Sequence, residues 1–420
     1  MFLFTFVEFN FYMDLIEDQY FIQGIPVLDI IKEYGTPIYV YDTQIIERQI
    51  NRLKSAFHVD KLGIHFACKA LNNINILKFI KSCDVGLDTV SIQEIWLGLK
   101  AGFTPDQIIY TPNCVGVDEI EMALKLGVQI NVDHIETLEY IGHHYPESKI
   151  CIRINPHVMA GGNEKISVGH IDSKFGISIY QLPLVIRLVQ TLKLNINGLH
   201  MHTGSDILDA GVFTLASQIL FDAALKFPDL EFIDFGSGLK VPYQTDDVST
   251  DIEEVGELLS NSFNEFCNQY GRKLKLYFEP GKYLVSESGM FFVKTNVIKQ
   301  TPSTVFAGVD SGLNHLIRPM FYGSYHQILN ISNPKGRPRI YNVVGYICET
   351  DTFASNRAIS EIHPNDILGF KNAGAYCFSM ASNYNSRFKP AEVMIHEGKH
   401  YMIRERESIE DLLKNQIEVL

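Results

Sequence analysis

Residues 63–69 read GIHFACK, an apolar run of β-strand length that ends in a cysteine and a lysine. Seven similar runs follow, and stretches with the apolar periodicity of amphipathic helices separate them. They are VGLDTV (85–90), QIIYT (107–111), VQINVD (128–133), KICIRIN (149–155), INGLHMH (196–202), LEFIDFG (230–236) and KLYFEP (275–280). Eight strand–helix units predict an α/β fold with a TIM-type (β/α)8 barrel. A doubly wound open sheet is the alternative.

Two of the intervening stretches carry distinct helix signals. Ser91 and Glu94 form a capping-box pattern ahead of a stretch that ends near Ala101. Residues 252–270 form a second amphipathic stretch of helical length.

The pattern changes after Gly289 to short β-type runs that proline and glycine turns interrupt. These runs are MFFVKTNVI (290–298), TVFAGVD (304–310), RIYNVVGYI (339–347) and AEVMIHEG (391–398). TPIYVYD (36–42) has the same character, so we expect the C-terminal β domain to take in an N-terminal strand. The expected division is an extension without function (1–12, with Met13 as a second possible start), a segment contributing to the β domain (13–43), a barrel (44–288) and a C-terminal β domain (289–420).

Composition excludes several classes of partner. With 46% hydrophobic and 20% charged residues the chain can bury a large core, and its net charge of -13 offers no basic surface to nucleic acid or anionic lipid. The apolar opening MFLFTFVEFNFY is too short to span a bilayer and lacks a basic flank. Seven scattered cysteines without a C-x-x-C spacing indicate reduced thiols and a cytoplasmic protein.

Polar residues and glycine turns gather where the predicted strands end. In a TIM barrel the carboxyl ends of the strands form the mouth at which chemistry takes place. The residues at these ends are Lys69, Asp88, Arg153, His200, His202, Gly204, Ser205, Gly236, Ser237, Gly238, Glu279, Gly281 and Lys282. Their convergence predicts an active site at this mouth.

Lys69 is the candidate nucleophile. Partial burial behind the run IHFAC would favour its neutral amine, which attacks carbonyl groups. The ordinary alternative is a lysine that reaches solvent. Glycine turns after three neighbouring strands would offer backbone N–H groups to a phosphate, and the hydroxyls of Ser205 and Ser237 could add donors.

The two histidines suit a flat ring better than a metal ion. His200 and His202 stand two residues apart, so they would face the same way on a strand. No further ligand stands at a convincing spacing, and we therefore predict no metal site. His202 is placed to stack on a heteroaromatic ring, and His200 to orient or pack.

Two further charged residues have alternative roles. Glu279 could hold a pyridine nitrogen protonated, or could form an ion pair with a barrel lysine. Arg153 could contact a cofactor, or could brace Asp88 or Glu279.

Eight longer stretches carry a family resemblance. They are FACKALNN (66–73), GLDTVSIQE (86–94), HMHTGSDI (200–207), DFGSGLKVPY (234–243), EPGKYLVSESG (279–289), VDSGLNHLIRPMFYGSYH (309–326), VVGYICETDTF (343–353) and GAYCFSMASNYNSRFKPAEV (374–393). With these motifs the chain resembles the fold type III, alanine-racemase-like decarboxylases that depend on pyridoxal phosphate. The resemblance extends from about Thr36 to Glu392.

The resemblance implies a site for pyridoxal 5'-phosphate in the barrel. Lys69 would hold the cofactor as a Schiff base, His202 would stack on its ring, and Glu279 would face the pyridine nitrogen. Ser205, Gly236 and Gly238 would surround the phosphate.

The resemblance also implies a homodimer whose active sites are shared between subunits. The β domain of a second subunit would supply Cys348 as the proton donor and Glu349 as a substrate contact, and Tyr376 would reach the cofactor. Taken alone, Cys348 could equally be a small buried hydrophobic residue.

The sequence departs from the family pattern at two positions. Lys282 stands where an arginine usually follows Glu-Pro-Gly, which keeps the charge and loses bidentate recognition of a carboxylate. Ser237 stands within a turn that usually has three glycines.

The expected substrate follows from the cationic residues of the distal pocket. Arg318, with Tyr322 and Lys282, suits a substrate whose far end carries a carboxylate. Meso-2,6-diaminopimelate fits, with Glu349 binding its distal ammonium, and its decarboxylation to L-lysine would be the last step of lysine biosynthesis. Arg318 could instead brace the dimer.

Three other functions stay open at this point. A decarboxylase of carboxynorspermidine, arginine or ornithine would share every cofactor residue. A racemase of this fold is disfavoured by Glu279. A binding protein without activity is disfavoured by the presence of Lys69 and Cys348.

Overall fold

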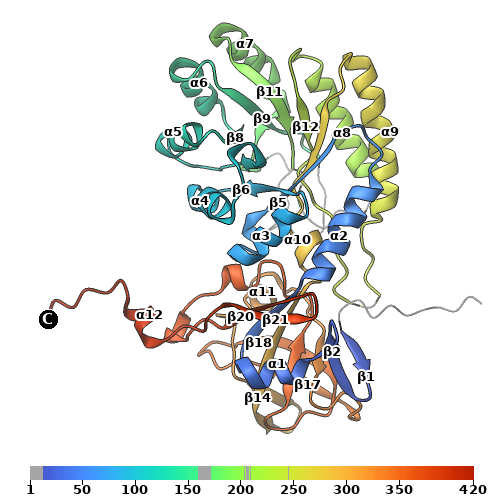
Figure 1. Ribbon diagram of the computed structural model, residues 1–420, viewed down its shortest axis with the longest axis vertical. Coiled ribbons are helices and arrows are strands. Elements are labelled where there is room, and N and C mark those ends of the chain that lie inside the picture. The colour runs from blue at the N-terminus through green and yellow to red at the C-terminus, as the bar shows by residue number, and fades with distance from the viewer. Residues whose placement is uncertain (1–12, 159–171, 203, 205–207, 209, 245) are drawn as a thin grey trace, which may run out of the picture. The chain divides into compact units, whose positions relative to one another are not determined.

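The computed structural model describes residues 13–158, 172–202, 204, 208, 210–244 and 246–420. The chain forms two compact units (Figure 1). The barrel unit is Glu47–Leu284, and the β unit combines the described residues up to Ile46 with Val285–Leu420. The extension predicted for residues 1–12 lies outside the described residues.

Eight parallel strands form a closed sheet in the barrel unit. They are β5 (Leu62–Ala67), β6 (Gly86–Thr89), β7 (Ile108–Tyr110), β8 (Gln129–Val132), β9 (Lys149–Asn155), β11 (Asn195–His200), β12 (Phe232–Asp234) and β13 (Lys275–Phe278). Neighbours in this order are paired, and β13 also pairs with β5, so the sheet has no open edge. The predicted TIM-type barrel is confirmed, and the open doubly wound sheet is excluded. A two-residue strand, β10 (Ile177–Ser178), pairs with β9 as well.

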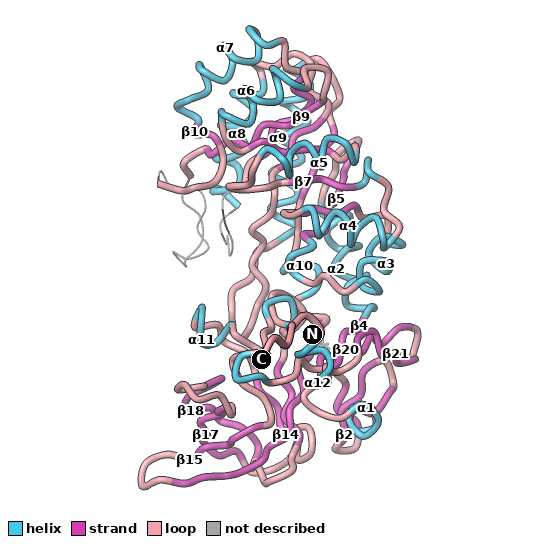
Figure 2. Tube along the Cα trace, turned by 90° about the vertical axis from the view of Figure 1, so that its left-hand side faces the viewer, coloured by secondary structure: helices cyan, strands magenta, loops and turns pink. Residues whose placement is uncertain are grey.

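Helices lie on the outside of these strands (Figures 1 and 2). They are α3 (Ile74–Ser82), α4 (Ile92–Ala101), α5 (Val117–Leu126), α6 (Ile135–His144), α7 (Leu182–Leu192), α8 (Ala210–Ala224) and α9 (Ile252–Tyr270). Helix α9 has the predicted bounds. It begins where the Asp251 carboxylate accepts from the Glu254 N–H, and it ends at Gly271, which adopts a left-handed φ of 79°.

The capping box predicted for α4 is only half formed. The Ser91 hydroxyl accepts from the Glu94 N–H at 3.2 Å, as expected for an N-cap. The Glu94 carboxylate, however, accepts from the Val90 N–H at 2.8 Å and not from Ser91. Glu94 is therefore turned toward the buried side of the helix start.

The β unit takes in the predicted N-terminal strand. Strand β4 (Ile38–Asp42) pairs with β14 (Gly289–Gln300) on one side and with β20 (Ala391–His396) on the other. The remaining elements are β1 (Asp14–Ile16), β2 (Gln19–Ile22), β3 (Ile25–Pro26), β15 (Val305–Val309), β16 (Ile328–Asn330), β17 (Pro338–Val344), β18 (Thr352–Ser360), β19 (Ile367–Phe370), β21 (Lys399–Arg404), α1 (Val27–Tyr34), α11 (Arg318–Tyr322) and α12 (Ile409–Leu413). Two helices, α2 (Thr43–Ala56) and the four-residue α10 (Lys282–Val285), contain the points at which the chain passes between the units.

Burial explains why β4 belongs to this sheet. All five of its residues are buried, and the Tyr39 ring stacks on Phe291 of β14 with the centroids 4.4 Å apart. Ile38 and Val40 join a core cluster with Val27 and Ile30 of α1. A strand that buries both faces is most stable inside a sheet, because each face then loses its contact with water.

No helix among the described residues is long and apolar enough to cross a membrane.

Candidate active site

Lys69 directly follows β5. The chain turns into a 3-10 helix (Cys68–Ala70), so Cys68 and Ala70 are buried while Lys69 between them is exposed. The expected partial burial of Lys69 is therefore wrong, because Lys69 is the exposed residue of this 3-10 helix. Its charge lowers the pKa values of Asp88, Glu94 and Glu279, which shows that these carboxyl groups lie near it.

Strand register brings two predicted polar residues, Arg153 and His200, to the same height as Asp234. His200 of β11 is paired with Arg153 of β9 on one side and with Asp234 of β12 on the other. All three side chains are buried. Glu279 follows the last residue of β13 and is buried as well. The side chains of Arg153, His200 and Glu279 therefore lie at one end of the barrel, as the sequence predicted.

His200, Asp234 and Glu279 form a buried cluster in which His200 and Glu279 are hydrogen-bonded to each other. His200 Nε2 lies 3.0 Å from Glu279 Oε2. Burial and the Glu279 charge raise the pKa of Asp234 well above its usual range. Burial also raises the pKa of Glu279, but the positive charges of Lys69 and Arg153 lower it and so reduce the shift. Of these two carboxyl groups, Asp234 is therefore the one whose protonated form is favoured more strongly.

This cluster corrects one step of the sequence argument. Sequence spacing indicated no further ligand for the histidines, whereas one ligand atom from each of His200, Asp234 and Glu279 lies within 4.8 Å of the others. The lowered pKa of His200 and the raised pKa of Asp234 favour the neutral forms of both groups. Strand β11 ends at His200, so His202 does not share a strand face with it.

Asp88 and Glu94 form a second pair of buried acids. Burial and the Glu279 charge raise the pKa of Asp88 to about 8, against the opposing effects of Lys69 and Arg153. Burial raises the pKa of Glu94 to about 7. Arg153, whose guanidinium lies 5.0 Å from the Phe175 ring centroid, favours the charged form of Asp88.

We expect the stability of the cofactor-free protein to fall as pH rises. The folded pKa of Asp88 exceeds its unfolded value, so its favourable contribution is present at low pH and is lost as pH rises through about 8. Asp88→Asn should reduce the loss in melting temperature between pH 6 and pH 9 by about 2 °C or more. Thermal unfolding across this range checks the result, with Asp106→Asn at an exposed position of the same unit as the control. An equal loss in all three proteins would contradict the assignment.

Glycine turns follow β11 and β12. Gly204, Gly236 and Gly238 adopt φ values of 128°, 60° and 137°, which favour glycine. A Cβ at Gly236 would lie 2.8 Å from the Met201 carbonyl oxygen and from His202 Nδ1. The Ser237 N–H donates to His202 Nδ1 at 3.2 Å, which holds the half-buried imidazole beside the turn. Ser205 lies outside the described residues.

The predicted proton donor lies in the β unit, on the segment between β17 and β18. Cys348 and Glu349 are both exposed, so the alternative of a buried hydrophobic cysteine is excluded. The Asn385 amide donates to Cys348 Sγ at 3.3 Å, and the Tyr384 hydroxyl donates to Glu349. Asp351 shapes the segment, because its buried carboxylate accepts from the N–H groups of Leu313 and Ile347.

The predicted substrate residues of the β unit lie together. Arg318 is buried, and its guanidinium lies 5.5 Å from the Tyr322 ring centroid and 5.9 Å from that of Tyr376. Its Nη2 donates to Ser324 Oγ at 3.3 Å. Lys282 begins α10 in the barrel unit, two residues after Pro280.

Sequence reasoning missed two residues of the barrel mouth. Glu94 was interpreted only as a capping residue, and Asp234 was not singled out. Asp234 could have been found, because it directly precedes the Phe-Gly-Ser-Gly turn at the end of β12. No local signal distinguishes Glu94 from an ordinary capping glutamate.

The barrel mouth fits pyridoxal phosphate. Lys69 offers the amine of an exposed side chain for its aldehyde, and the glycine turns after β11 and β12 can offer backbone N–H groups to an anion. Glu279 Oε1 is buried and has no hydrogen-bond partner among the described residues, so it can accept from a protonated ring nitrogen.

Comparison with known proteins agrees with a site for pyridoxal phosphate. Residues 43–286 match the family model described as "Pyridoxal-dependent decarboxylase, pyridoxal binding domain". The chain is 40% identical to the diaminopimelate decarboxylase of Methanothermobacter thermautotrophicus over 94% of this chain and 95% of that enzyme. The Escherichia coli K12 enzyme of the same name is 35% identical over 91% and 94%. The crystal structure of Helicobacter pylori diaminopimelate decarboxylase complexed with L-lysine superposes with a TM-score of 0.85, at 32% identity, over 92% of this chain and 98% of that one.

Proposed function

Because the chain belongs to the family of pyridoxal-dependent decarboxylases, we propose that it removes carbon dioxide from meso-2,6-diaminopimelate and releases L-lysine. It is thus a carbon–carbon lyase of lysine biosynthesis. The observation that carries the choice of substrate is the buried Arg318, which Tyr322 and Tyr376 flank. A guanidinium held in this way selects a ligand with a carboxylate at its far end.

The barrel residues hold and polarise the cofactor in this proposal. Pyridoxal phosphate, when bound, supplies the electron sink for the electron pair that departing carbon dioxide leaves behind. Lys69 binds the cofactor covalently through its amine. Glu279 keeps the ring nitrogen protonated, and the neighbouring Asp234 and His200 hold its carboxylate in place. Asp88 and Arg153 complete the charged surroundings.

The remaining cofactor contacts come from the turns at the barrel mouth. The His202 imidazole, which the Ser237 N–H holds in place, would pack against the pyridine ring and help to orient it. The phosphate is bound by backbone N–H groups and by serine hydroxyls. These contacts are assigned to Gly204, Ser205, Gly236, Ser237, Gly238 and Gly281.

Cys348 is the proposed proton donor. A thiol at an exposed position can deliver its proton from Sγ to the carbon atom that has lost carbon dioxide. We assign Cys348, Glu349 and Tyr376 to the active site of a second subunit, so the functional form is a homodimer. Glu349 binds the distal ammonium of the substrate.

The distal carboxylate of the substrate is assigned to Arg318, Tyr322 and Lys282. Arg318→Met should raise the KM for meso-diaminopimelate by about tenfold or more, because a hydrogen bond between two charged groups is lost. Arg339→Met is the matched control, since Arg339 is exposed and pairs with Glu361 in the same unit. Equal KM values for the two variants would refute this assignment.

A substrate panel tests the reaction itself. The purified holoenzyme is supplied with meso-diaminopimelate, ornithine, arginine and carboxynorspermidine, and carbon dioxide release is measured. We expect release from meso-diaminopimelate alone, with L-lysine as the product. Faster release from any of the other three would assign the chain to a different decarboxylase.

We also place the protein in the cytoplasm. All seven cysteines are free thiols, and reduced thiols are typical of that compartment.

A further inference from the structure

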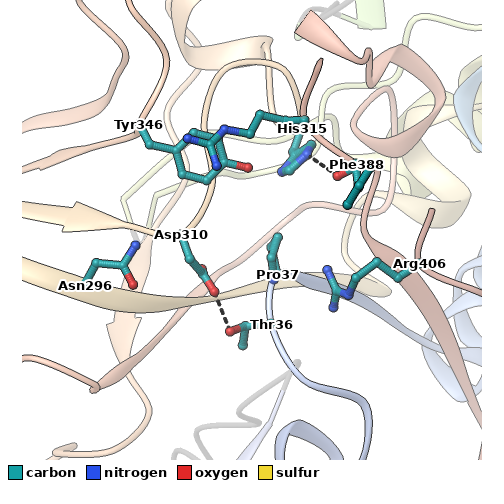
Figure 3. A pocket seen from close by; sticks show the side chains of 9 residues that line it. Thr36, Pro37, Asn296, Asp310, His315, Tyr346, Phe388 and Arg406 are labelled. Carbon is teal, nitrogen blue, oxygen red and sulfur yellow. Dashed lines mark hydrogen bonds between the residues drawn. The ribbon is translucent and has the colours of Figure 1, made fainter. Parts of the chain in front are cut away.

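The β unit contains a cavity of about 370 Å³ apart from the proposed active site (Figure 3). It lies beside the turn that precedes β4 and the bulge of β14 at residue 296. The residues that line it are Thr36, Pro37, Asn296, Asp310, His315, Tyr346, Arg387, Phe388 and Arg406. None of the residues assigned above to substrate or cofactor is among them.

Arg406 is the unusual member of this lining. It is half-buried, and its Nη2 has no contact with water and no hydrogen-bond partner among the described residues. Figure 3 shows its guanidinium directed toward Pro37 at the edge of the cavity. Arg404, two residues earlier, pairs with Glu392 and covers the Phe378 ring. A buried guanidinium N–H without an acceptor is costly. The rest of this half-buried guanidinium lines the cavity and can donate to an anionic ligand there.

The acidic residue of the cavity is already hydrogen-bonded. Asp310 Oδ2 accepts from the Thr36 hydroxyl at 2.6 Å, and Oδ1 accepts from the Lys294 N–H at 2.8 Å. Asp310 does raise the pKa of Arg406 from a distance, against the burial that lowers it. Asp310 therefore balances one positive charge and leaves the donors of Arg406 unused.

His315 adds no charge at neutral pH. Burial lowers its pKa to about 4, and its two ring nitrogens are occupied by the Ser311 hydroxyl at 3.1 Å and the Phe388 carbonyl oxygen at 2.9 Å. With Arg387 and Arg406 positive and Asp310 negative, the lining carries a net charge of one positive unit. The cavity therefore attracts an anion.

Tyr346 holds the second guanidinium at the rim. Arg387 lies 3.9 Å from the Tyr346 ring centroid, a cation–π contact that restricts where its donors point. Burial raises the pKa of Tyr346 to about 12, so its hydroxyl remains a donor. The lining thus offers N–H and O–H donors beside the apolar surfaces of Pro37 and Phe388.

We propose that this cavity is a second small-molecule site, which binds an organic carboxylate of net negative charge between Arg406 and Arg387. Planar guanidinium groups match the two oxygens of a carboxylate, and the volume lies within the range of small-ligand sites. L-Lysine carries a net positive charge, so the product of the proposed reaction does not compete for this site.

Calorimetric titration of the holoenzyme with succinate tests the proposal. We expect saturable binding that Arg406→Met weakens by about tenfold or more, since charge-assisted hydrogen bonds are lost. Arg406→Lys should recover part of the affinity, because lysine restores the positive charge but not the paired N–H donors of the guanidinium. Arg318→Met is the control for binding at the active site and should leave the affinity for succinate unchanged.

Two further titrations test whether the site prefers a carboxylate to phosphate and whether L-lysine competes for it. Inorganic phosphate should bind more weakly than succinate, and saturating L-lysine should leave succinate binding unchanged. The proposal is overturned if succinate gives no heat, if phosphate binds more tightly, if L-lysine displaces succinate, or if Arg318→Met abolishes the signal. Should Arg406→Met not fold, Arg387→Met provides the same comparison. Because substrate turnover is not measured, these outcomes are independent of the proposed reaction.

Discussion

Lys69→Ala should lose the visible absorbance of bound pyridoxal phosphate and reduce decarboxylation by at least about 1,000-fold. Lys69 is the exposed amine at the barrel mouth near Asp88, Glu94 and Glu279. An alanine leaves the cofactor without a covalent anchor. Absorbance spectra of the purified protein and the rate of carbon dioxide release measure the two effects.

Lys78→Ala is the matched control, because Lys78 is an exposed lysine on α3 of the same barrel unit. Its spectrum and rate should equal those of the unaltered protein. A Lys69→Ala protein that kept the visible band would show that another amine holds the cofactor.

Cys348→Ala should lower kcat by about 10² to 10⁴-fold, the range that a positioned proton donor contributes. The visible absorbance should remain, because Cys348 lies in the β unit and is not assigned to cofactor binding. Cys114→Ala is the control, since Cys114 is also an exposed cysteine. If both variants kept full activity, the proton would have to come from another group.

Mixing the two inactive variants tests whether active sites are shared between subunits. Random pairing of Lys69→Ala with Cys348→Ala subunits makes half of the dimers mixed, and one of the two sites in each mixed dimer is intact. Activity should therefore recover to about one quarter of the normal value, measured after the subunits have been allowed to exchange. If each site is formed within one chain, the mixture stays inactive.

Much of the fold could be predicted because its signals are local. Each barrel strand is a short apolar run bounded by turns, and each helix has its own period and caps, as the bounds of α9 illustrate. The strand β4 was also predictable, because its apolar run has no solvent-facing side.

The outline of the active site was predictable for a geometric reason. In a closed parallel sheet all strands point the same way, so residues at their carboxyl ends must meet. Lys69, His200 and Glu279 could be grouped on this basis, although more than 200 residues separate the first from the last.

The states of these groups depend on neighbours that are distant in the sequence. The sequence does not show that Asp234 would share a buried cluster with Glu279, or that burial would raise the pKa of Glu94 to about 7. Lys69 is exposed because it is the middle residue of a three-residue 3-10 helix whose other two residues, Cys68 and Ala70, are buried. Arg406 Nη2 lacks a hydrogen-bond partner because of the way in which β4, β14 and the chain after β21 pack together.

By itself, then, the sequence determined the order of the strands, the closed barrel and the set of residues at its mouth, because periodicity and strand direction are properties of short segments. The tertiary structure decided which of those residues are buried, in which direction their pKa values shift and which of their polar atoms lack a hydrogen-bond partner. Burial and charge–charge distance are set by the packing of segments far apart in the chain, and no local pattern encodes them.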